Sequence, residues 1–160
     1  MLAVAASKAG GKNLPVSFLQ ADAEDLPLPS ESYDLVLAIT TLCLASQPAA
    51  VLREAFRLLR ADGRLVIGEL NRNSYWAWIR RTKALFTKST YRRARFFSRP
   101  ALEGMLDQAG FKPAEIRSLL YFPPVNSTFI LNHGVWFEEK GRRLLPGGGA
   151  FLALKVDKQT

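Results

Sequence analysis

An unbroken apolar run, Leu35-Val-Leu-Ala-Ile39, stands between polar neighbours and limits the folds that this chain can adopt. A strand that is apolar at every position is typical of a parallel sheet with both faces buried. An amphipathic helical pattern over 48–60 follows, and then another apolar run at Leu65–Ile67. Because strands alternate with helices, the sequence predicts an α/β fold with a largely parallel sheet and flanking helices.

The rest of the chain continues this alternation. A helix is expected over 1–9, ended by Gly10-Gly11, and a short buried strand over Val16–Leu19 precedes a loop over 21–32. We find no internal repeat and no linker, so residues 1–160 are expected to form a single domain. Further helices are expected over 73–88, 98–109 and 131–145, and further strands over 116–122 and 150–156.

Composition excludes several classes of protein. Of the 160 residues, 48% are hydrophobic, which is enough to form a core. No apolar run approaches the roughly 20 residues of a membrane span, and no secretory signal is visible, so a soluble cytoplasmic protein is expected. The single cysteine, Cys43, excludes an internal disulfide and is expected to be a small buried apolar residue. With one cysteine and one histidine, no metal site of the usual spacing is expected.

Acidic and hydroxyl side chains follow two of the expected strands. Asp22, Glu24 and Asp25 come after the run at 16–19, and Thr40 comes after the run at 35–39. Ligands of parallel α/β sheets bind outside the carboxyl ends of the strands. Carboxylates there can accept hydrogen bonds from an amino group or a sugar hydroxyl, and backbone N–H groups can pair with ring nitrogens. An adenosine would satisfy both sets, while a solvated turn stiffened by prolines remains an equal alternative.

Four segments, in order, resemble the class I S-adenosylmethionine-dependent methyltransferases. FLQADAEDLPLPSESYDLVLA is similar to the family's strand, acidic loop and following strand, and LREAFRLLRADGRLVIGEL to its next helix, reversal and fifth strand. MLAVAASKA resembles the helix after the second strand, and FFSRPALEGMLDQAGF a later helix. The resemblance implies a Rossmann-like fold, S-adenosyl-L-methionine as cofactor and a small-molecule acceptor, in a quinone-biosynthesis-like branch.

The resemblance also implies roles for individual residues around that cofactor. Asp22 matches the acid that receives the adenine amino group, and Ala23 the residue whose backbone N–H meets the ring. Glu24 and Leu26 would border this pocket, and Met1 matches a methionine that packs on the adenine. Thr40 and Thr41 match the loop beside the methionine part of the cofactor and the substrate. His133 is a weak candidate for a catalytic base, and a surface histidine is the more favoured interpretation.

One departure from the family pattern is large. The family's strand order is 3-2-1-4-5-7-6, and the first two strands, with their glycine-rich loop, have no counterpart here. Gly147–Gly149 precedes an expected strand and is interpreted as a turn. We therefore expect a domain that is incomplete at its N-terminus. Either the 16–19 strand closes onto the 35–39 strand, or another copy of the chain fills the gap. The alternative function is a non-catalytic methyltransferase-like remnant that acts as a binding module.

Positive charge is concentrated in the second half of the chain. Residues 1–70 carry a net charge of −2, whereas residues 71–160 carry +10. Residues 72–99 contain nine basic side chains and no acid, interleaved with aromatic residues. Three interpretations stay open for this segment. It forms the solvated face of a surface helix, it covers the substrate site, or it contacts an anionic membrane surface; nucleic acid is a less favoured partner.

Overall fold

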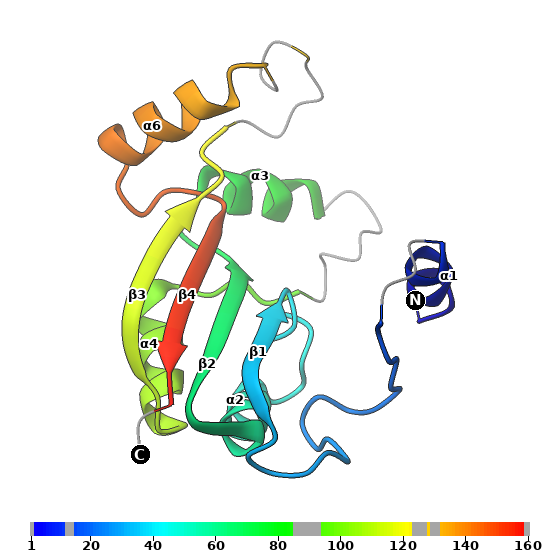
Figure 1. Ribbon diagram of the computed structural model, residues 1–160. Helices are drawn as coiled ribbons and strands as arrows, with labels where there is room; N and C mark the ends of the chain where they lie inside the picture. The colour runs from blue at the N-terminus through cyan, green and yellow to red at the C-terminus, as the bar shows by residue number, and fades with distance from the viewer. Residues whose placement is uncertain (1, 12–14, 85–93, 123–127, 129–131, 159–160) are drawn as a thin grey trace.

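The computed structural model describes residues 2–11, 15–84, 94–122, 128 and 132–158. Its helices and strands alternate along the chain except where α4 follows α3 (Figure 1). In order they are α1 (Leu2–Gly10), β1 (Tyr33–Ile39), α2 (Pro48–Leu58), β2 (Leu59–Leu70), α3 (Tyr75–Ala84), α4 (Arg99–Gln108), β3 (Lys112–Leu119), α6 (Gly134–Leu144) and β4 (Phe151–Asp157).

The strands form one mixed sheet in the order β1-β2-β4-β3. β1 is parallel to β2, and β4 is antiparallel to both of its neighbours, so β4 alone runs against the other three. The sheet order β1-β2-β4-β3 matches 4-5-7-6, the last four places in the strand order 3-2-1-4-5-7-6 of the family that the sequence resembles. The predicted α/β class is therefore confirmed, with the reversal of β4 as the feature that makes the sheet mixed.

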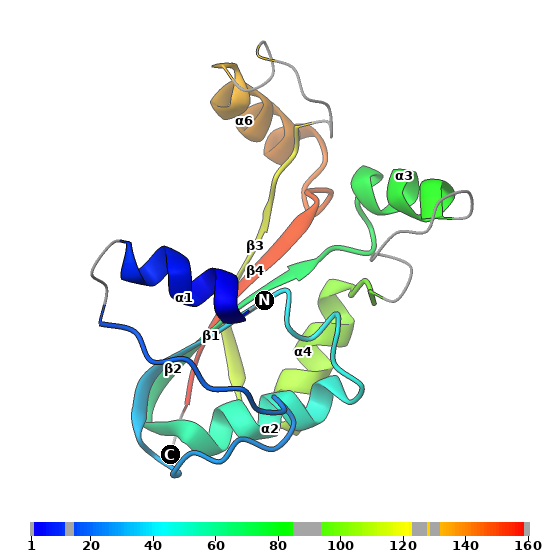
Figure 2. The same ribbon diagram turned by 90° about the vertical axis from the view of Figure 1, so that its right-hand side faces the viewer.

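Helix α2 is amphipathic and covers one face of this sheet. Pro48 occupies the first turn, where its missing N–H costs no helical hydrogen bond. Val51, Leu52 and Ala55 recur at helical spacing and are buried. They belong to the same core cluster as Leu65 of β2. Figure 2 shows α2 and α4 on one side of the sheet and α1 on the other.

Helix α4 completes the core on that side. Leu102 and Leu106 are fully buried. The helix is followed by Gly110, whose φ of 94° is costly for any residue with a Cβ atom. This turn places the buried Phe111 against Phe56 of α2 with ring centroids 5.0 Å apart in an edge-to-face contact. The stripe predicted for 98–109 is thus confirmed.

The other face of β1 is exposed. Leu35, Leu37 and Ile39 are 50%, 63% and 50% exposed, whereas Ala38, on the α2 side, is buried. The expectation that β1 is buried on both faces is therefore wrong for the described residues. A continuous apolar run indicates a strand that can be buried on both faces, but it does not specify what covers the second face.

The strand predicted at Val16–Leu19 is not formed. This segment is assigned to no helix or strand, and Val16 and Leu19 are each 52% exposed. It does not close onto β1, because no described strand pairs with the outer edge of β1. An extended segment becomes a strand through hydrogen bonds to a neighbour, and an apolar run alone does not supply that neighbour.

Several boundaries differ from the predicted ones. β2 begins at Leu59, directly after α2, and Asp62 has a φ of 61° inside it. β3 spans Lys112–Leu119, earlier than the predicted 116–122, and part of the helix predicted over 73–88 lies outside the described residues. Among the described helices, none combines the length and the apolar character that crossing a bilayer requires.

Candidate functional site

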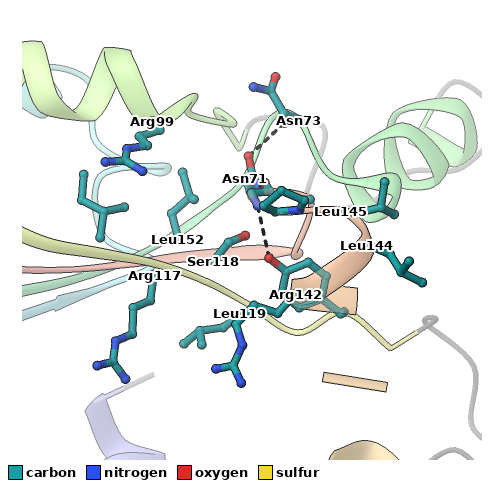
Figure 3. Close-up of a pocket in the computed structure, with 15 residues that line it drawn as sticks. Asn71, Asn73, Arg99, Arg117, Ser118, Leu119, Arg142, Leu144, Leu145 and Leu152 are labelled. Atoms are coloured by element: carbon teal, nitrogen blue, oxygen red, sulfur yellow. Dashed lines mark hydrogen bonds between the residues drawn. The ribbon is translucent and has the colours of Figure 1, made fainter. Parts of the chain in front are cut away.

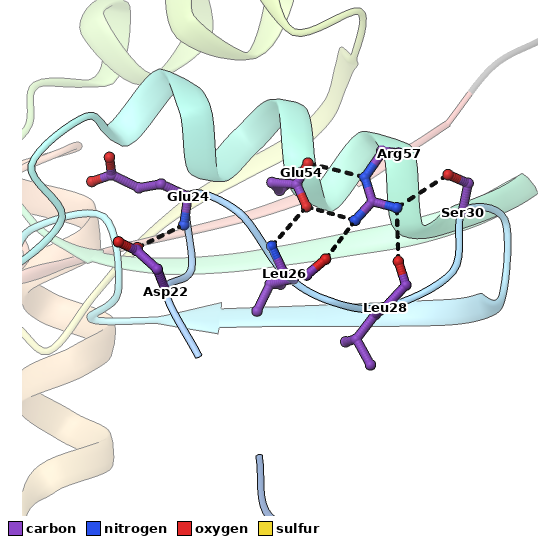
Figure 4. A network of polar contacts seen from close by, with 7 residues as sticks. All are labelled: Asp22, Glu24, Leu26, Leu28, Ser30, Glu54 and Arg57. Atoms are coloured by element: carbon purple, nitrogen blue, oxygen red, sulfur yellow. Dashed lines mark hydrogen bonds and ion pairs between the residues drawn. The ribbon is translucent and has the colours of Figure 1, made fainter. Parts of the chain in front are cut away.

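The loop after residue 21 is fixed to α2 by a hydrogen-bond network (Figure 4). The guanidinium of Arg57 donates from Nη2 to the Leu26 carbonyl at 3.0 Å and from Nη1 to the Leu28 carbonyl at 2.8 Å. Glu54 pairs with Arg57 at 2.7 Å and accepts the Leu26 N–H at 3.1 Å. The Arg57 guanidinium is the main cause that holds the pKa of Glu54 below its ordinary value.

The acidic residues occupy the other end of this loop. Glu24 accepts the backbone N–H of Gln47 at 2.7 Å, and Gln47 occupies the N-cap position of α2 without a side-chain cap hydrogen bond. This bond joins the acidic loop to the last residue of the connection, 40–47, that runs from the end of β1 to α2. Asp22 accepts the Glu24 N–H on Oδ1 at 3.0 Å. Within the described residues, Asp22 Oδ2 and the Ala23 N–H have no hydrogen bond.

The predicted residues of this loop therefore divide into two groups. Glu24 and Leu26 are occupied by hydrogen bonds that fix the loop to α2 and its N-terminus. Asp22 and Ala23 retain unused hydrogen-bonding groups, and Ala23 also packs against the core cluster. The first group supports the shape of the loop, and the second can contact a ligand.

The turn after β1 has a strained backbone. Thr40 has a φ of 52°, a left-handed conformation that is uncommon for a residue other than glycine. Its N–H donates to the Gly68 carbonyl at 2.7 Å, and its hydroxyl donates to the Ile39 carbonyl at 2.7 Å. The Thr41 hydroxyl reaches the same carbonyl at 3.4 Å. Strained residues of this kind cluster at functional sites, where the surrounding structure holds them in place.

Below this turn lies a buried carboxyl group that the sequence analysis missed. Glu69 of β2 is fully buried, and its Oε1 accepts the Leu42 N–H at 2.7 Å. Burial raises the pKa of Glu69 above its ordinary value. Its Oε2 has no hydrogen-bond partner among the described residues. The signal was available, because Glu69 is the only acid in the apolar run of β2 that faces the core.

The neighbouring Cys43 is buried, as predicted. Burial, followed by the charge of Glu69, raises the pKa of its thiol to about 12. The thiol donates to the Thr40 carbonyl at 3.4 Å. A thiol that stays protonated at neutral pH is a poor nucleophile, so Cys43 serves as packing beneath the Thr40 turn.

The two remaining candidates are not brought to this site by the described contacts. Met1 lies outside the described residues. His133 is exposed and directly precedes α6. No group of three or more potential ligands that could hold a metal occurs among the residues the structure describes.

A separate cavity of about 800 Å³ lies beside the ends of β2 and β3 (Figure 3). On its wall, Asn71 donates from Nδ2 to the carbonyls of Gly147 and Gly149, each at 2.7 Å. These bonds hold the turn predicted at Gly147–Gly149, where Gly147 has a φ of 88°. None of the predicted cofactor residues that the structure describes lines this cavity.

Comparison with known proteins identifies the family. Residues 1–67 match the family model described as a methyltransferase domain. A Thermotoga maritima structure described as an S-adenosylmethionine-dependent methyltransferase, possible histamine N-methyltransferase, is 31% identical, with a TM-score of 0.70. The alignment covers 96% of this chain and 69% of that one. The chain belongs to the S-adenosylmethionine-dependent methyltransferases.

Curated relatives of this chain are similar over shorter segments. An uncharacterized Mycobacterium tuberculosis protein is 40% identical over 101 residues, which are 63% of this chain and 35% of that protein. The demethylmenaquinone methyltransferase of Thermus thermophilus is 39% identical over 69 residues, 43% of this chain and 31% of that enzyme. The matched part of the chain thus spans about a third of the length of these two relatives.

Proposed function

We propose that this chain takes part in methyl transfer from S-adenosylmethionine to a small-molecule acceptor, with the adenosine held by the loop that begins at Asp22. One observation supports the proposal most directly. The Glu24–Gln47 hydrogen bond fixes the acidic loop to the N-terminus of α2, the helix that follows β1, while Asp22 Oδ2 and the Ala23 N–H stay unused within the described residues. Such a loop can receive a ligand at the sheet edge where α/β proteins bind them.

The two unused groups fit an adenine base. Its exocyclic amino group is a donor that matches the Asp22 carboxylate, and a ring nitrogen is an acceptor that matches the Ala23 N–H. The network of Arg57 and Glu54 fixes the loop before any ligand arrives, which lowers the entropy cost of binding. The fit concerns the nucleoside part, and the Thr40 turn would lie toward the remainder of the cofactor.

S-adenosylmethionine, when bound, supplies a methyl group on a positively charged sulfur, and the protein's task is to align the acceptor with it. The backbone of the Thr40 turn is fixed for such a task by its bond to Gly68. The name of the Thermus relative supports a quinone-like acceptor for this chain. His133 remains a weak candidate for a base, to be examined only if the acceptor must lose a proton.

Isothermal titration of the 160-residue chain with S-adenosylmethionine tests this proposal. We expect saturable binding at one site per chain, and competition by adenosine but not by free methionine at the same concentration. Absence of binding up to millimolar cofactor would contradict it. Transfer of a tritium-labelled methyl group to a demethylated quinone would then identify the acceptor class.

The alternative is a non-catalytic methyltransferase-like module that binds a partner. It is favoured by the exposed face of β1, where Leu35, Leu37 and Ile39 form an apolar row. A second copy of the chain is one partner that this row would suit. The same titration separates the two functions, because a module of this kind has no need of the cofactor.

A further inference from the structure

Two helices extend beyond the sheet at the end where β2 and β3 finish (Figures 1 and 2). We call α3 and α6 together the helical tip. The Trp76 indole of α3 donates to the Phe122 carbonyl, beyond the end of β3, at 2.7 Å. Glu138 of α6 accepts the N–H groups of Leu120 and Tyr121 at 2.9 and 3.0 Å. Both helices are therefore attached to the chain that leaves β3.

Helix α6 has an inner face and an outer face. Gly141 faces Tyr121 so closely that a Cβ atom would collide with its ring, so this side of the helix is the inner one. On the outer face, Val135 and Trp136 are 76% and 53% exposed. Lys140 and Arg143 follow Trp136 at intervals of four and seven residues, which places them along the same side of the helix. Apolar and basic side chains therefore share the outer face.

Further apolar side chains are exposed on α3 and at the C-terminal end of α6. Tyr75 and Trp78 are 61% and 63% exposed, and their rings stack with centroids 6.2 Å apart. Leu144 and Leu145 are 75% and 65% exposed. Counting Leu145, the residue directly after α6, six large apolar side chains of the helical tip are thus exposed, more than isolated exposed residues would explain. Leu144 and Leu145 lie on the wall of the cavity that Tyr121 also lines.

The charge around these side chains is mostly positive. Lys140, Arg142 and Arg143 are exposed on α6, and Arg72 is exposed just before α3. Of the two acids of α6, Glu138 is occupied by the backbone of Leu120 and Tyr121, and Glu139 is exposed. The half of the chain that carries the tip, residues 71–160, has a net charge of +10.

We propose that the helical tip docks on the surface of an anionic lipid bilayer. Tryptophan and tyrosine favour the boundary between lipid headgroups and acyl chains, where an apolar ring and a polar N–H or O–H are both satisfied. Leucine and valine enter the acyl region, while lysine and arginine pair with anionic headgroups. The helical tip carries all three kinds of side chain at one end of the molecule.

Other ligands suit this composition less well. Nucleic acid would use the cations and could stack on the aromatic rings, but it offers nothing to Val135, Leu144 and Leu145. The inference goes beyond the proposed methyl transfer and does not depend on it. A lipid-soluble acceptor would give the docking an evident purpose, yet vesicle binding can be measured without cofactor or acceptor.

Co-sedimentation with vesicles tests the docking. We expect the intact chain to bind vesicles of phosphatidylcholine with about 30 mol% phosphatidylserine, and to bind pure phosphatidylcholine at least ten-fold more weakly, roughly as the loss of two or more headgroup contacts implies. The double variant Trp78→Ala/Trp136→Ala should bind the anionic vesicles about ten-fold more weakly, since it loses the interfacial rings. Replacing Arg142 and Arg143 by alanine should weaken binding by about the same factor and reduce its dependence on salt.

Val16→Ala/Leu19→Ala is the matched control, because it removes two exposed apolar side chains that lie outside the helical tip. It should bind vesicles as the unchanged chain does, and circular dichroism should show that each variant is folded. Equal binding to anionic and neutral vesicles would contradict the inference. So would unchanged binding by the tryptophan double variant, or complete displacement of the chain from anionic vesicles by a short RNA.

Discussion

The buried Glu69 carboxylate at the end of β2 accepts the backbone N–H of Leu42 at 2.7 Å. This single bond joins the core of the sheet to the turn that follows β1, which includes the strained Thr40. The turn is thus held from two sides, by the Gly68 carbonyl at Thr40 and by Glu69 at Leu42. Both bonds are made within the chain, so its own residues hold the turn.

The first prediction concerns the pH dependence of stability. Because burial raises the pKa of Glu69 in the folded chain above the ordinary value of 4.5, the folded state binds more protons than the unfolded state above pH 4.5. The contribution of Glu69 to the free energy of unfolding should therefore fall as the pH rises from 4.5 through the raised pKa. Urea unfolding of the unchanged chain and of Glu69→Gln across this range measures it.

Glutamine keeps an acceptor for the Leu42 N–H but cannot ionise, so the stability of Glu69→Gln relative to the unchanged chain should increase with pH. Glu54→Gln is the control, and its stability relative to the unchanged chain should change with pH in the opposite direction. Arg57 lowers the pKa of Glu54, so the Glu54 contribution is present above pH 4.5 and is lost as the pH falls through the lowered pKa. Parallel pH profiles for the unchanged chain and Glu69→Gln would show that Glu69 does not titrate as described.

A second prediction concerns the Cys43 thiol. With a pKa of about 12 and a buried sulfur, it should react with iodoacetamide at neutral pH far more slowly than free cysteine. In concentrated urea the rate should rise to that of free cysteine, which provides the internal control. Rapid alkylation of the folded chain would contradict the placement of Cys43 beneath the Thr40 turn.

A third prediction tests the packing of α2 on the sheet. Leu52 is fully buried, and Leu52→Ala should lower the free energy of unfolding by about 2–5 kcal/mol through lost apolar contact and the cavity that remains. Leu144→Ala changes the same atoms at a side chain that is 75% exposed and should stay within about 0.5 kcal/mol of the unchanged chain. Similar losses at the two positions would place Leu52 outside the core.

A fourth prediction concerns the network that fixes the acidic loop. Arg57→Ala removes the donors to the Leu26 and Leu28 carbonyls, so amide hydrogen exchange should become faster over residues 22–32. Arg53→Ala, at an exposed position one turn away on the same helix, should leave this exchange unchanged. Equal exchange in the two variants would mean that Arg57 does not hold the loop.

Much of the architecture could be predicted from apolar patterns, because they record burial directly. The buried apolar residues of α2 are one example, because they recur at helical spacing. The turn at Gly147 is another, because a glycine directly before a strand favours a turn. The Val16–Leu19 strand was predicted wrongly because an apolar run does not show whether a hydrogen-bonding neighbour exists. Strand formation depends on a neighbour that the local sequence does not contain.

The site was predictable in part. The acids after residue 21 could be located because they follow an apolar run, yet the pattern did not separate Asp22, with an unused oxygen, from Glu24, which is occupied by Gln47. Arg57 looked like its neighbours Arg53 and Arg60 on the polar face of the helix. Its role depends on a loop almost 30 residues earlier, a contact that periodicity does not report.

The most direct test of the central claim compares two carboxylates in the same loop. Cofactor affinity should be measured by isothermal titration for the unchanged chain, Asp22→Asn and Asp25→Asn. We predict that Asp22→Asn weakens S-adenosylmethionine binding by about ten- to a hundred-fold, as for the loss of a hydrogen bond to a charged group, while Asp25→Asn changes it little. Equal affinity of the Asp22→Asn variant and the unchanged chain would contradict the assignment of this loop to the adenosine.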